Sequence, residues 1–203
     1  MLRVALTGGI ATGKSYVLER FRQRGIPCLD ADELVRGVTA AGTEASAAIA
    51  ARFGRDVLAA DGSIDRPRLA SIVFADAVAR RDLEAIVHPG VYRAITAGLR
   101  AFELIGEPQL AVVDVPLLYE SGHAGDFDRV IVTDCPVEVQ LSRLRERGMS
   151  DAEARQRVGA QWPNGEKTAR ATFVIRTGGT FQDTDRQVDE VLSLLTERTA
   201  PSG

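Results

Sequence analysis

The chain has 203 residues, of which 45% are hydrophobic, a length that suits one domain or one core with an inserted subdomain. A formal net charge of −3 argues against bulk binding of nucleic acid, and no apolar run is long enough to span a membrane. Because we see no basic, cleavable leader, we expect a cytoplasmic protein. Cys28 and Cys135 each border an apolar run, so we expect buried free thiols in a reducing compartment.

Five short apolar runs predict the strands of a buried parallel sheet. They lie at 2–7, 26–29, 110–115, 129–133 and 172–175. Helical patterns separate most of them, which favours an α/β fold with helices on both faces. The first helix is predicted from Ser15 to Arg24, with a stop at Gly25. Later helices are predicted from a proline at 136, a capping box at 150 and 153, and an apolar stripe from 188 to 195.

The stretch 33–106 is too long for a single crossover between strands. It holds helical patterns and no good strand, with predicted helices at 43–53, 67–74, 76–87 and 91–105. The break between the last two is placed at His88-Pro89, because the residue before a proline is disfavoured in a helix. We interpret the stretch as a helical insertion that holds a second substrate.

These patterns predict a single domain with three kinds of subregion. The nucleotide-binding core is assigned to 1–32, 107–142 and 171–203, the helical acceptor subdomain to 33–106, and an arginine-rich lid to 143–170. A solvated helical face is the alternative interpretation of the arginine-rich segment.

Residues 8–15 form a complete phosphate-binding loop with the pattern G-x-x-x-x-G-K-[ST]. The sequence is Gly8-Gly9-Ile10-Ala11-Thr12-Gly13-Lys14-Ser15, after an apolar run and before an amphipathic helix. In that setting, loop amides and the helix N-terminus point at phosphate oxygens, Lys14 charges the terminal phosphates, and Ser15 offers a hydroxyl to Mg²⁺. Only two of the 25 basic residues are lysines, so a lysine inside the loop suggests a specific need for an ammonium.

Acidic residues follow two of the predicted strands. Asp30 and Asp32 come after the second run, at the edge of the sheet where open α/β folds bind ligands. One of them is a candidate to orient or deprotonate an acceptor hydroxyl, and the other is a candidate N-cap for the helix near Glu33. Asp114 ends the third run, as in a Walker B strand that steadies Mg²⁺.

Two arginines, Arg143 and Arg147, lie one helical turn apart and are candidates to contact phosphate oxygens. Surface salt bridges with Glu138 or Glu146 remain an alternative. His88 is by itself more typical of a structural cap or a surface residue than of a ligand.

The chain resembles the dephospho-CoA kinase family over nearly its whole length. The matching segments are 6–10 with 13–15, Asp30-Ala31-Asp32, 61–66 with Leu69 and 73–74, Ile86-Val87-His88-Pro89, 114–120, 140–144, 157–161, and 166–167 leading to 171–175. This resemblance implies transfer of the ATP γ-phosphate to the ribose 3′-hydroxyl of dephospho-CoA, with Mg²⁺, in the last step of coenzyme A biosynthesis. It places Asp32 next to that hydroxyl, and Arg66, His88, Leu117 and Leu118 along the acceptor site. We accordingly expect Lys14, Arg143 and Arg147 to contact the phosphates, residues 8–16 from Gly8 to Tyr16 to bind the nucleotide, and Ser15 with Asp114 to hold the metal.

Four places depart from the family pattern. Ala11 stands where a third glycine is usual, so the loop is expected to avoid a positive φ there, and Tyr16 replaces a common small threonine. The segment 163–166 stands where Pro-x-Glu-Glu is usual, and 176–179 stands where Asp-Asn precedes a small-residue pair. The base preference therefore stays open.

Two other functions are compatible with parts of this pattern. A kinase for nucleoside monophosphates needs an arginine clamp for the acceptor phosphate, and the arginines of 33–106 do not exclude it. A nucleotide-binding regulator without turnover needs a broken set of acids, whereas Asp32 and Asp114 are both present. We expect small-molecule substrates, no nucleic-acid or membrane partner, and a monomer, with a homo-oligomer left open.

Overall fold

The computed structural model describes residues 1–106 and 108–197. They form two compact units: unit 1 consists of Met1–Leu29 and the described residues from Ala101 onward, and unit 2 is Asp30–Arg100. The sequence analysis placed the start of the helical insertion at residue 33 and assigned Asp30 and Asp32 to the core. In the structure unit 2 begins at Asp30, and it therefore contains both residues. The end of the predicted core, 198–203, and residue 107 lie outside the described residues.

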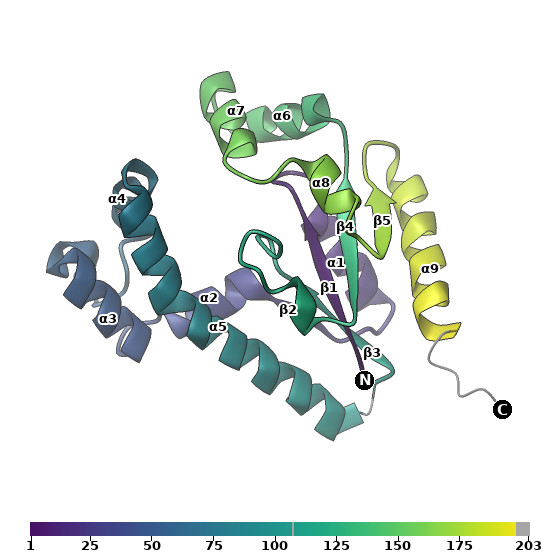
Figure 1. Cartoon of the computed structure of the whole chain (residues 1–203), viewed down its shortest axis with the longest axis horizontal. Coiled ribbons are helices and arrows are strands. Elements are labelled where there is room, and N and C mark those ends of the chain that lie inside the picture. The colour runs from purple at the N-terminus through teal and green to yellow at the C-terminus, as the bar shows by residue number, and fades with distance from the viewer. Residues whose placement is uncertain (107, 198–203) are drawn as a thin grey trace. The chain divides into compact units, whose positions relative to one another are not determined.

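A five-stranded sheet forms the centre of unit 1 (Figure 1). Its strands are β1 (Leu2–Gly8), β2 (Cys28–Asp30), β3 (Leu110–Asp114), β4 (Arg129–Asp134) and β5 (Phe173–Arg176), in the order β2-β3-β1-β4-β5. β1 pairs in parallel with β3 and with β4, and β4 pairs in parallel with β5. The predicted parallel α/β sheet is confirmed, with strand ends that differ from the apolar runs by a few residues.

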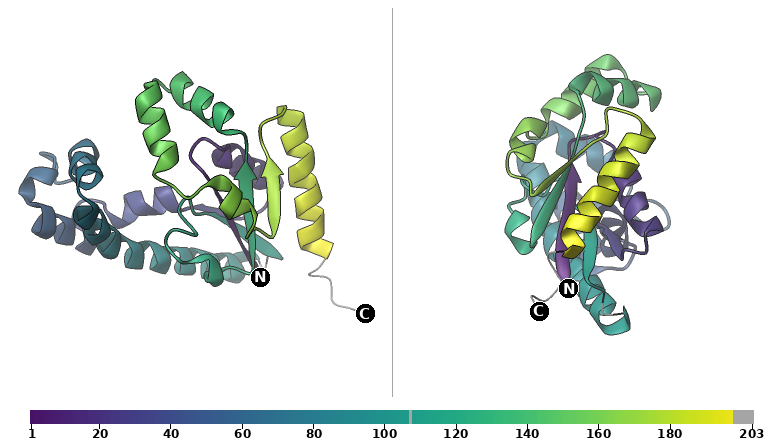
Figure 2. Two further views of the ribbon diagram at one scale, coloured as in Figure 1. Left: turned by 45° about the horizontal axis from the view of Figure 1, so that its top comes forward. Right: turned by 90° about the vertical axis from the view of Figure 1, so that its right-hand side faces the viewer.

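Two helices, α1 (Lys14–Gln23) and α9 (Phe181–Glu197), pack together against the sheet (Figure 2). Their buried side chains join those of β1, β3, β4 and β5 in one hydrophobic cluster that includes Val4, Leu18, Phe21 and Leu195. α1 ends before Gly25, whose φ of 76° is the left-handed conformation that suits glycine. This cluster fixes the angle at which α1 leaves the first strand.

Three helices lie between β4 and β5. They are α6 (Val137–Glu146), α7 (Asp151–Gly159) and α8 (Asn164–Thr168). The predicted capping box of Ser150 and Glu153 is present at the start of α7. α6 and α7 share a smaller cluster in which Leu141, Leu144 and Ala154 surround Ala11. Short 3₁₀ turns occur at Arg55–Val57 and Ala124–Asp126.

Unit 2 is helical. It contains α2 (Ala31–Val38), α3 (Glu44–Phe53), α4 (Arg66–Ala75) and most of α5 (Ala77–Gly106). Side chains cap three of these helices: Asp30 begins α2, Thr43 begins α3 and Asp65 begins α4.

The predicted break at His88-Pro89 is wrong, because α5 is one helix of 30 residues that continues through Pro89. A proline inside a helix costs about 3 kcal/mol, since it removes one hydrogen bond and crowds the preceding turn. This cost is offset by the burial of an apolar stripe that continues on both sides of the proline, at Val87, Val91, Ile95 and Leu99. A Cβ at Gly90 would lie 2.6 Å from Val38 Cγ1, so α2 and α5 are in close contact beside the proline.

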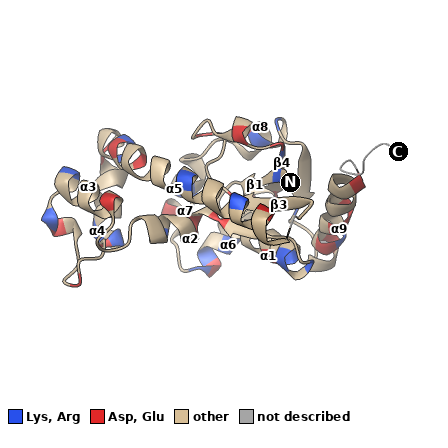
Figure 3. Cartoon of the chain, turned by 90° about the horizontal axis from the view of Figure 1, so that it is seen from below, with Lys and Arg blue, Asp and Glu red and all other residues tan. Residues whose placement is uncertain are grey.

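Charged residues of both signs occur on several helices (Figure 3). Arginines and acids share α3, α5 and α9, in keeping with a net charge of only −3. Within 1–106 and 108–197, no helix is long and apolar enough to cross a membrane.

Candidate active site

The phosphate-binding loop lies between the end of β1 and the start of α1. β1 ends at Gly8 and α1 begins at Lys14, within one residue of the predicted helix start at Ser15. A side chain at Gly8 would overlap Thr133 and Thr12, and Gly13 has a φ of 87°. Both glycines are therefore required by the shape of the turn.

Ala11 does not avoid a positive φ, which corrects the expectation from the sequence. Its φ is 59°, and it is the only non-glycine residue with a positive φ in the part of the chain that the structure describes. An alanine in this conformation carries a cost of about 1–2 kcal/mol. Its methyl group is buried against Leu141, Leu144 and Ala154, and this packing opposes the backbone cost.

Side chains hold four successive carbonyl groups of the loop. The donors are Thr12 Oγ1 to Gly9 O (2.7 Å), Gln140 Nε2 to Ile10 O (2.6 Å), Arg143 Nη1 to Ala11 O (3.0 Å) and Thr177 Oγ1 to Thr12 O (2.7 Å). In a trans peptide the C=O and N–H groups point in opposite directions. Fixing the carbonyls of Ile10 and Thr12 therefore directs the N–H groups of Ala11 and Gly13 away from the side chains that hold those carbonyls.

The N–H groups that point away from those side chains make an anion site. Those of Ala11 and Gly13 have no acceptor within the described residues, and the first N–H groups of α1 have no partner inside the helix. Converging N–H groups at a helix N-terminus attract phosphate. Lys14 adds an ammonium whose Nζ lies 3.4 Å from Gly8 O.

Asp114 lies at the end of β3, beside the base of the loop. It pairs in register with Leu6 of β1, and only 5% of its surface is exposed. Ser15 lies at the N-terminus of α1 with an exposed side chain. A hydroxyl and a carboxylate are the hard oxygen ligands that Mg²⁺ accepts together with substrate phosphates and water. Among the described residues there is no group of three or more His, Cys, Asp and Glu side chains that could hold a metal ion.

The predicted phosphate-contacting arginines have different surroundings. Arg143 lies in α6, and besides Ala11 O it donates from Nη2 to Thr177 O at 2.6 Å. It thus joins the loop to the segment after β5. Arg147 follows the last residue of α6 and is exposed. The Tyr16 hydroxyl donates to Asp185 Oδ1 at 2.9 Å, so this side chain faces α9 while its backbone remains in α1.

Asp30 and Asp32 have separate roles in the local structure. Asp30 Oδ1 accepts hydrogen bonds from the N–H groups of Asp32 (2.8 Å) and Glu33 (3.3 Å). Asp30 is therefore the helix cap, which settles which of the pair plays that part. Asp32 lies in the first turn of α2 with an exposed side chain.

The other acceptor candidates are divided between the units. In unit 2, Arg66 Nη2 donates to Thr39 Oγ1 at 3.2 Å, and the His88 and Tyr92 rings are nearly perpendicular, with their centroids 6.3 Å apart. In unit 1, Leu117 is 40% exposed whereas Leu118 is fully buried. Of these two leucines, Leu117 presents its side chain to the surface.

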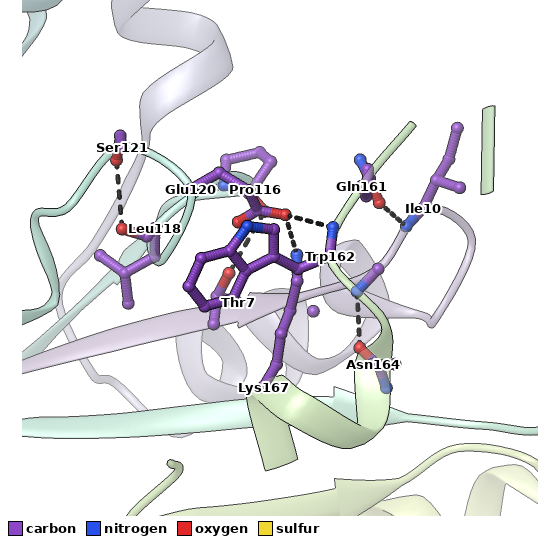
Figure 4. A network of polar contacts seen from close by, with 12 residues as sticks. Thr7, Ile10, Pro116, Leu118, Glu120, Ser121, Gln161, Trp162, Asn164 and Lys167 are labelled. Atoms are coloured by element: carbon purple, nitrogen blue, oxygen red, sulfur yellow. Dashed lines mark hydrogen bonds and ion pairs between the residues drawn. The ribbon is translucent and has the colours of Figure 1, made fainter. Parts of the chain in front are cut away.

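Residues 161–167, here called the strap, contact the phosphate-binding loop. The sequence analysis selected none of their side chains for a role in the site. Gln161 Oε1 accepts from Ile10 N at 2.7 Å, and Asn164 Oδ1 accepts from Gly9 N at 3.0 Å (Figure 4). The Lys167 ammonium lies 2.6 Å from Glu120 Oε1 and is fully buried. The signal in the sequence was compositional, because the strap holds the only asparagine, the only tryptophan and one of two lysines.

A cavity of about 890 Å³ opens beside Gly9. It is lined by the start of α6, by the strap, by Arg176 at the end of β5, and by Gly178 and Gly179 after that strand. Cys135 also lines it, and burial raises the pKa of its thiol. The cavity is large enough for a nucleoside next to the phosphate-binding loop.

The strand–loop–helix unit, the acid at the end of β3 and the parallel sheet define the P-loop fold of nucleotide-binding proteins. The fold of a shikimate kinase from Acinetobacter baumannii is similar, with a TM-score of 0.52, 16% identity and coverage of 98% of this chain and 94% of the other. A structure described as TT1252 from Thermus thermophilus has a TM-score of 0.81 and 33% identity, over 96% of this chain and 97% of that one.

The sequence comparisons narrow this class to one family. A family model described as dephospho-CoA kinase matches residues 2–183. The chain is 44% identical to the dephospho-CoA kinase of Geobacillus kaustophilus over 94% of its length and 95% of the relative's. It is 46% identical to that of Anaeromyxobacter dehalogenans, over 95% of this chain and 91% of the relative. The chain belongs to the dephospho-CoA kinase family.

Proposed function

We propose that this chain transfers the γ-phosphoryl group of ATP to the ribose 3′-hydroxyl of dephospho-CoA, using the residues described above. Membership of the family gives the reaction, which converts dephospho-CoA to coenzyme A in the last step of coenzyme A biosynthesis. The observation that supports the residue assignment is the loop whose carbonyls are held by side chains, which leaves its N–H groups directed so that they can bind an anion.

In this mechanism the nucleotide occupies residues 8–16. The N–H groups of Ala11, Gly13 and the start of α1, together with Lys14, hold the β- and γ-phosphates. The nucleoside lies in the 890 Å³ cavity. Ser15 and Asp114 would hold Mg²⁺, which would neutralise charge on the phosphates.

The acceptor residues are those that the family resemblance assigns. Asp32 orients the 3′-hydroxyl or accepts its proton, and Arg66, His88, Leu117 and the supporting Leu118 line its binding site. The segment 33–106 is the acceptor subdomain and 143–170 is the lid. Because the transition state of phosphoryl transfer is loose, a positioning role for Asp32 is sufficient.

Arg143 and Arg147 are proposed to stabilise the transferring phosphoryl group. Arg143 also holds the loop through Ala11 O, so Arg143→Ala is expected to lower both the melting temperature and kcat. Arg147 is exposed, so Arg147→Ala is expected to lower kcat alone. An unchanged kcat in Arg147→Ala would remove that residue from the mechanism.

We further propose that the enzyme works in the cytoplasm as a monomer on small-molecule substrates. Size-exclusion chromatography with light scattering tests the monomer, and a stable dimer would contradict it.

The deciding experiment follows ATP consumption by the purified protein with Mg²⁺, comparing dephospho-CoA, nucleoside monophosphates and no acceptor. We expect turnover with dephospho-CoA and coenzyme A as the product. Turnover only with a nucleoside monophosphate would overturn the proposed acceptor. Lys14→Ala and Asp32→Asn are each expected to collapse turnover, and a near-normal rate in Asp32→Asn would refute the role of Asp32.

A further inference from the structure

The strap bonds two N–H groups of the phosphate-binding loop that are not directed at the anion site. Gln161 accepts from Ile10 N and Asn164 accepts from Gly9 N. Asn164 is held in turn, because its Nδ2 donates to Asp134 Oδ1 at 2.5 Å and to Thr133 O at 3.2 Å. The asparagine therefore connects the first half of the loop to the end of β4.

The strap is anchored at a second place, away from the loop. Glu120 Oε1 lies 2.6 Å from Lys167 Nζ and accepts from Trp162 N at 3.1 Å. The Trp162 ring stacks on Tyr119 with an interplanar angle of 7°, and the Arg170 guanidinium lies 5.3 Å from the indole centroid (Figure 4 shows Trp162, Glu120 and Lys167). Because Lys167 is fully buried, the ion pair gives the strap a fixed position.

The bonds of the strap complete the constraint on the peptide groups around Ile10. Gln140 holds the carbonyl of Ile10 and Gln161 holds its N–H. With both groups bonded in the protein, the N–H of Ala11 has a defined direction. A loop fixed in advance binds phosphate without losing further conformational freedom.

We propose that Gln161 and Asn164 are positioning residues for the phosphate-binding loop, and that the Glu120–Lys167 pair fixes them in place. The proposal rests on the ATP site proposed above. If these side chains instead competed with phosphate for the N–H groups, removing them would strengthen the binding of Mg-ATP, whereas a positioning role predicts that removing them weakens it. The geometry favours positioning, because the phosphate-directed N–H groups are those of Ala11 and Gly13.

The test measures the dissociation constant of Mg-ATP by calorimetry without an acceptor, for Gln161→Met and Asn164→Ala. Methionine preserves the volume of Gln161 but cannot accept the hydrogen bond. One such bond corresponds to a loss of about three- to tenfold in affinity. We expect each variant to weaken Mg-ATP binding by that factor, with the KM for dephospho-CoA within about twofold of the parent. Gln156→Ala, on the exposed face of α7, is the matched control and should bind like the parent.

The anchor is tested with Trp162, the only tryptophan, as the fluorescent probe. In Lys167→Met we expect red-shifted emission, stronger quenching by acrylamide and the same weakening of Mg-ATP binding. If this variant does not fold, Glu120→Gln combined with Lys167→Met removes the pair without leaving a lone charge.

The outcomes separate this inference from the proposed function. If the parent does not bind Mg-ATP, the proposed site itself fails. If the parent binds and folded Gln161→Met and Asn164→Ala bind equally well, the strap has only a structural role and the inference is wrong. Tighter binding by these variants would also overturn it, since the side chains would then compete with phosphate.

Discussion

Lys167→Met offers a direct test of the buried ion pair in unit 1. Lys167 is fully buried and its Nζ lies 2.6 Å from Glu120 Oε1, whereas Glu120 retains 17% exposure. Removing one partner of a buried pair typically costs about 3–5 kcal/mol, because the remaining charge is desolvated without compensation. Glu120 keeps some water and the N–H of Trp162, so we expect the lower end, about 3 kcal/mol. In a protein of this size that corresponds to a fall of roughly 6–12 °C in melting temperature.

The paired variant separates the charge from the packing. In Glu120→Gln with Lys167→Met, the amide oxygen still accepts from Trp162 N and no unpaired charge remains. Replacing a whole buried pair is often nearly neutral, so we expect stability within about 1 kcal/mol of the parent. Urea unfolding followed by the fluorescence of Trp162 reports on unit 1 in each variant. The reasoning fails if Lys167→Met costs less than about 1 kcal/mol, or if the paired variant is as unstable as the single one.

Three further predictions concern the loop, unit 2 and a thiol. Ala11→Gly removes about 1–2 kcal/mol of backbone cost, but it also loses a buried methyl group and adds conformational freedom to the unfolded chain. The free energy of unfolding, measured by thermal denaturation, should therefore change by less than about 1 kcal/mol. A loss of stability above about 2 kcal/mol would contradict this. Gly90→Ala should destabilise the protein, because the new Cβ would lie 2.6 Å from Val38 Cγ1. Val38→Ala removes that atom and should reduce the destabilisation. If urea unfolding shows the same loss of stability for Gly90→Ala with Val38 and with Val38→Ala, the contact does not cause it. Burial raises the pKa of the Cys28 thiol to about 12. Its alkylation at pH 8, followed by peptide mass spectrometry, should therefore be at least ~100-fold slower in the folded than in the unfolded protein, and should become faster as the pH rises. Equal rates in the folded and the unfolded protein would refute the burial argument.

The phosphate-binding loop was predictable because its signals are local. The glycines at 8 and 13 and the lysine at 14 lie within eight residues, between an apolar run and an amphipathic helix. The groups that hold the loop are remote, since Gln140 and Thr177 lie 130 and 165 positions from the carbonyls they bond. Spacing rules carry no information about such contacts, which only the packing of β4, α6 and β5 creates.

Two local rules failed where tertiary packing opposed them. The preference against helix before a proline predicted an end at His88, but the buried stripe on both sides of Pro89 extends α5 through it. The preference of alanine for negative φ failed at Ala11, whose methyl is buried between α6 and α7. In both cases a cost of a few kcal/mol at one residue is opposed by burial that the local pattern does not reveal.

The pair Asp30 and Asp32 marks the limit of what the pattern Asp-Ala-Asp conveys. The sequence allowed either acid to cap the helix, and the structure assigns that role to Asp30 through the N–H groups of Asp32 and Glu33. The cap also restricts Asp32, because it fixes the backbone of the first turn of α2. The assignment of Asp32 to the 3′-hydroxyl remains a prediction.

The carbonyl contacts explain why the loop tolerates an alanine where a glycine is usual. Arg143 holds the carbonyl of Ala11 and Gln140 holds that of the residue before it, so the peptide groups on both sides of its Cα are fixed. A residue in that position keeps a positive φ because its neighbours leave no other choice, and strain of this kind persists only where the surroundings over-determine the backbone. Glycine would be free of the strain but would add freedom to the chain before folding. The alanine therefore belongs to the same arrangement that directs the loop N–H groups toward phosphate.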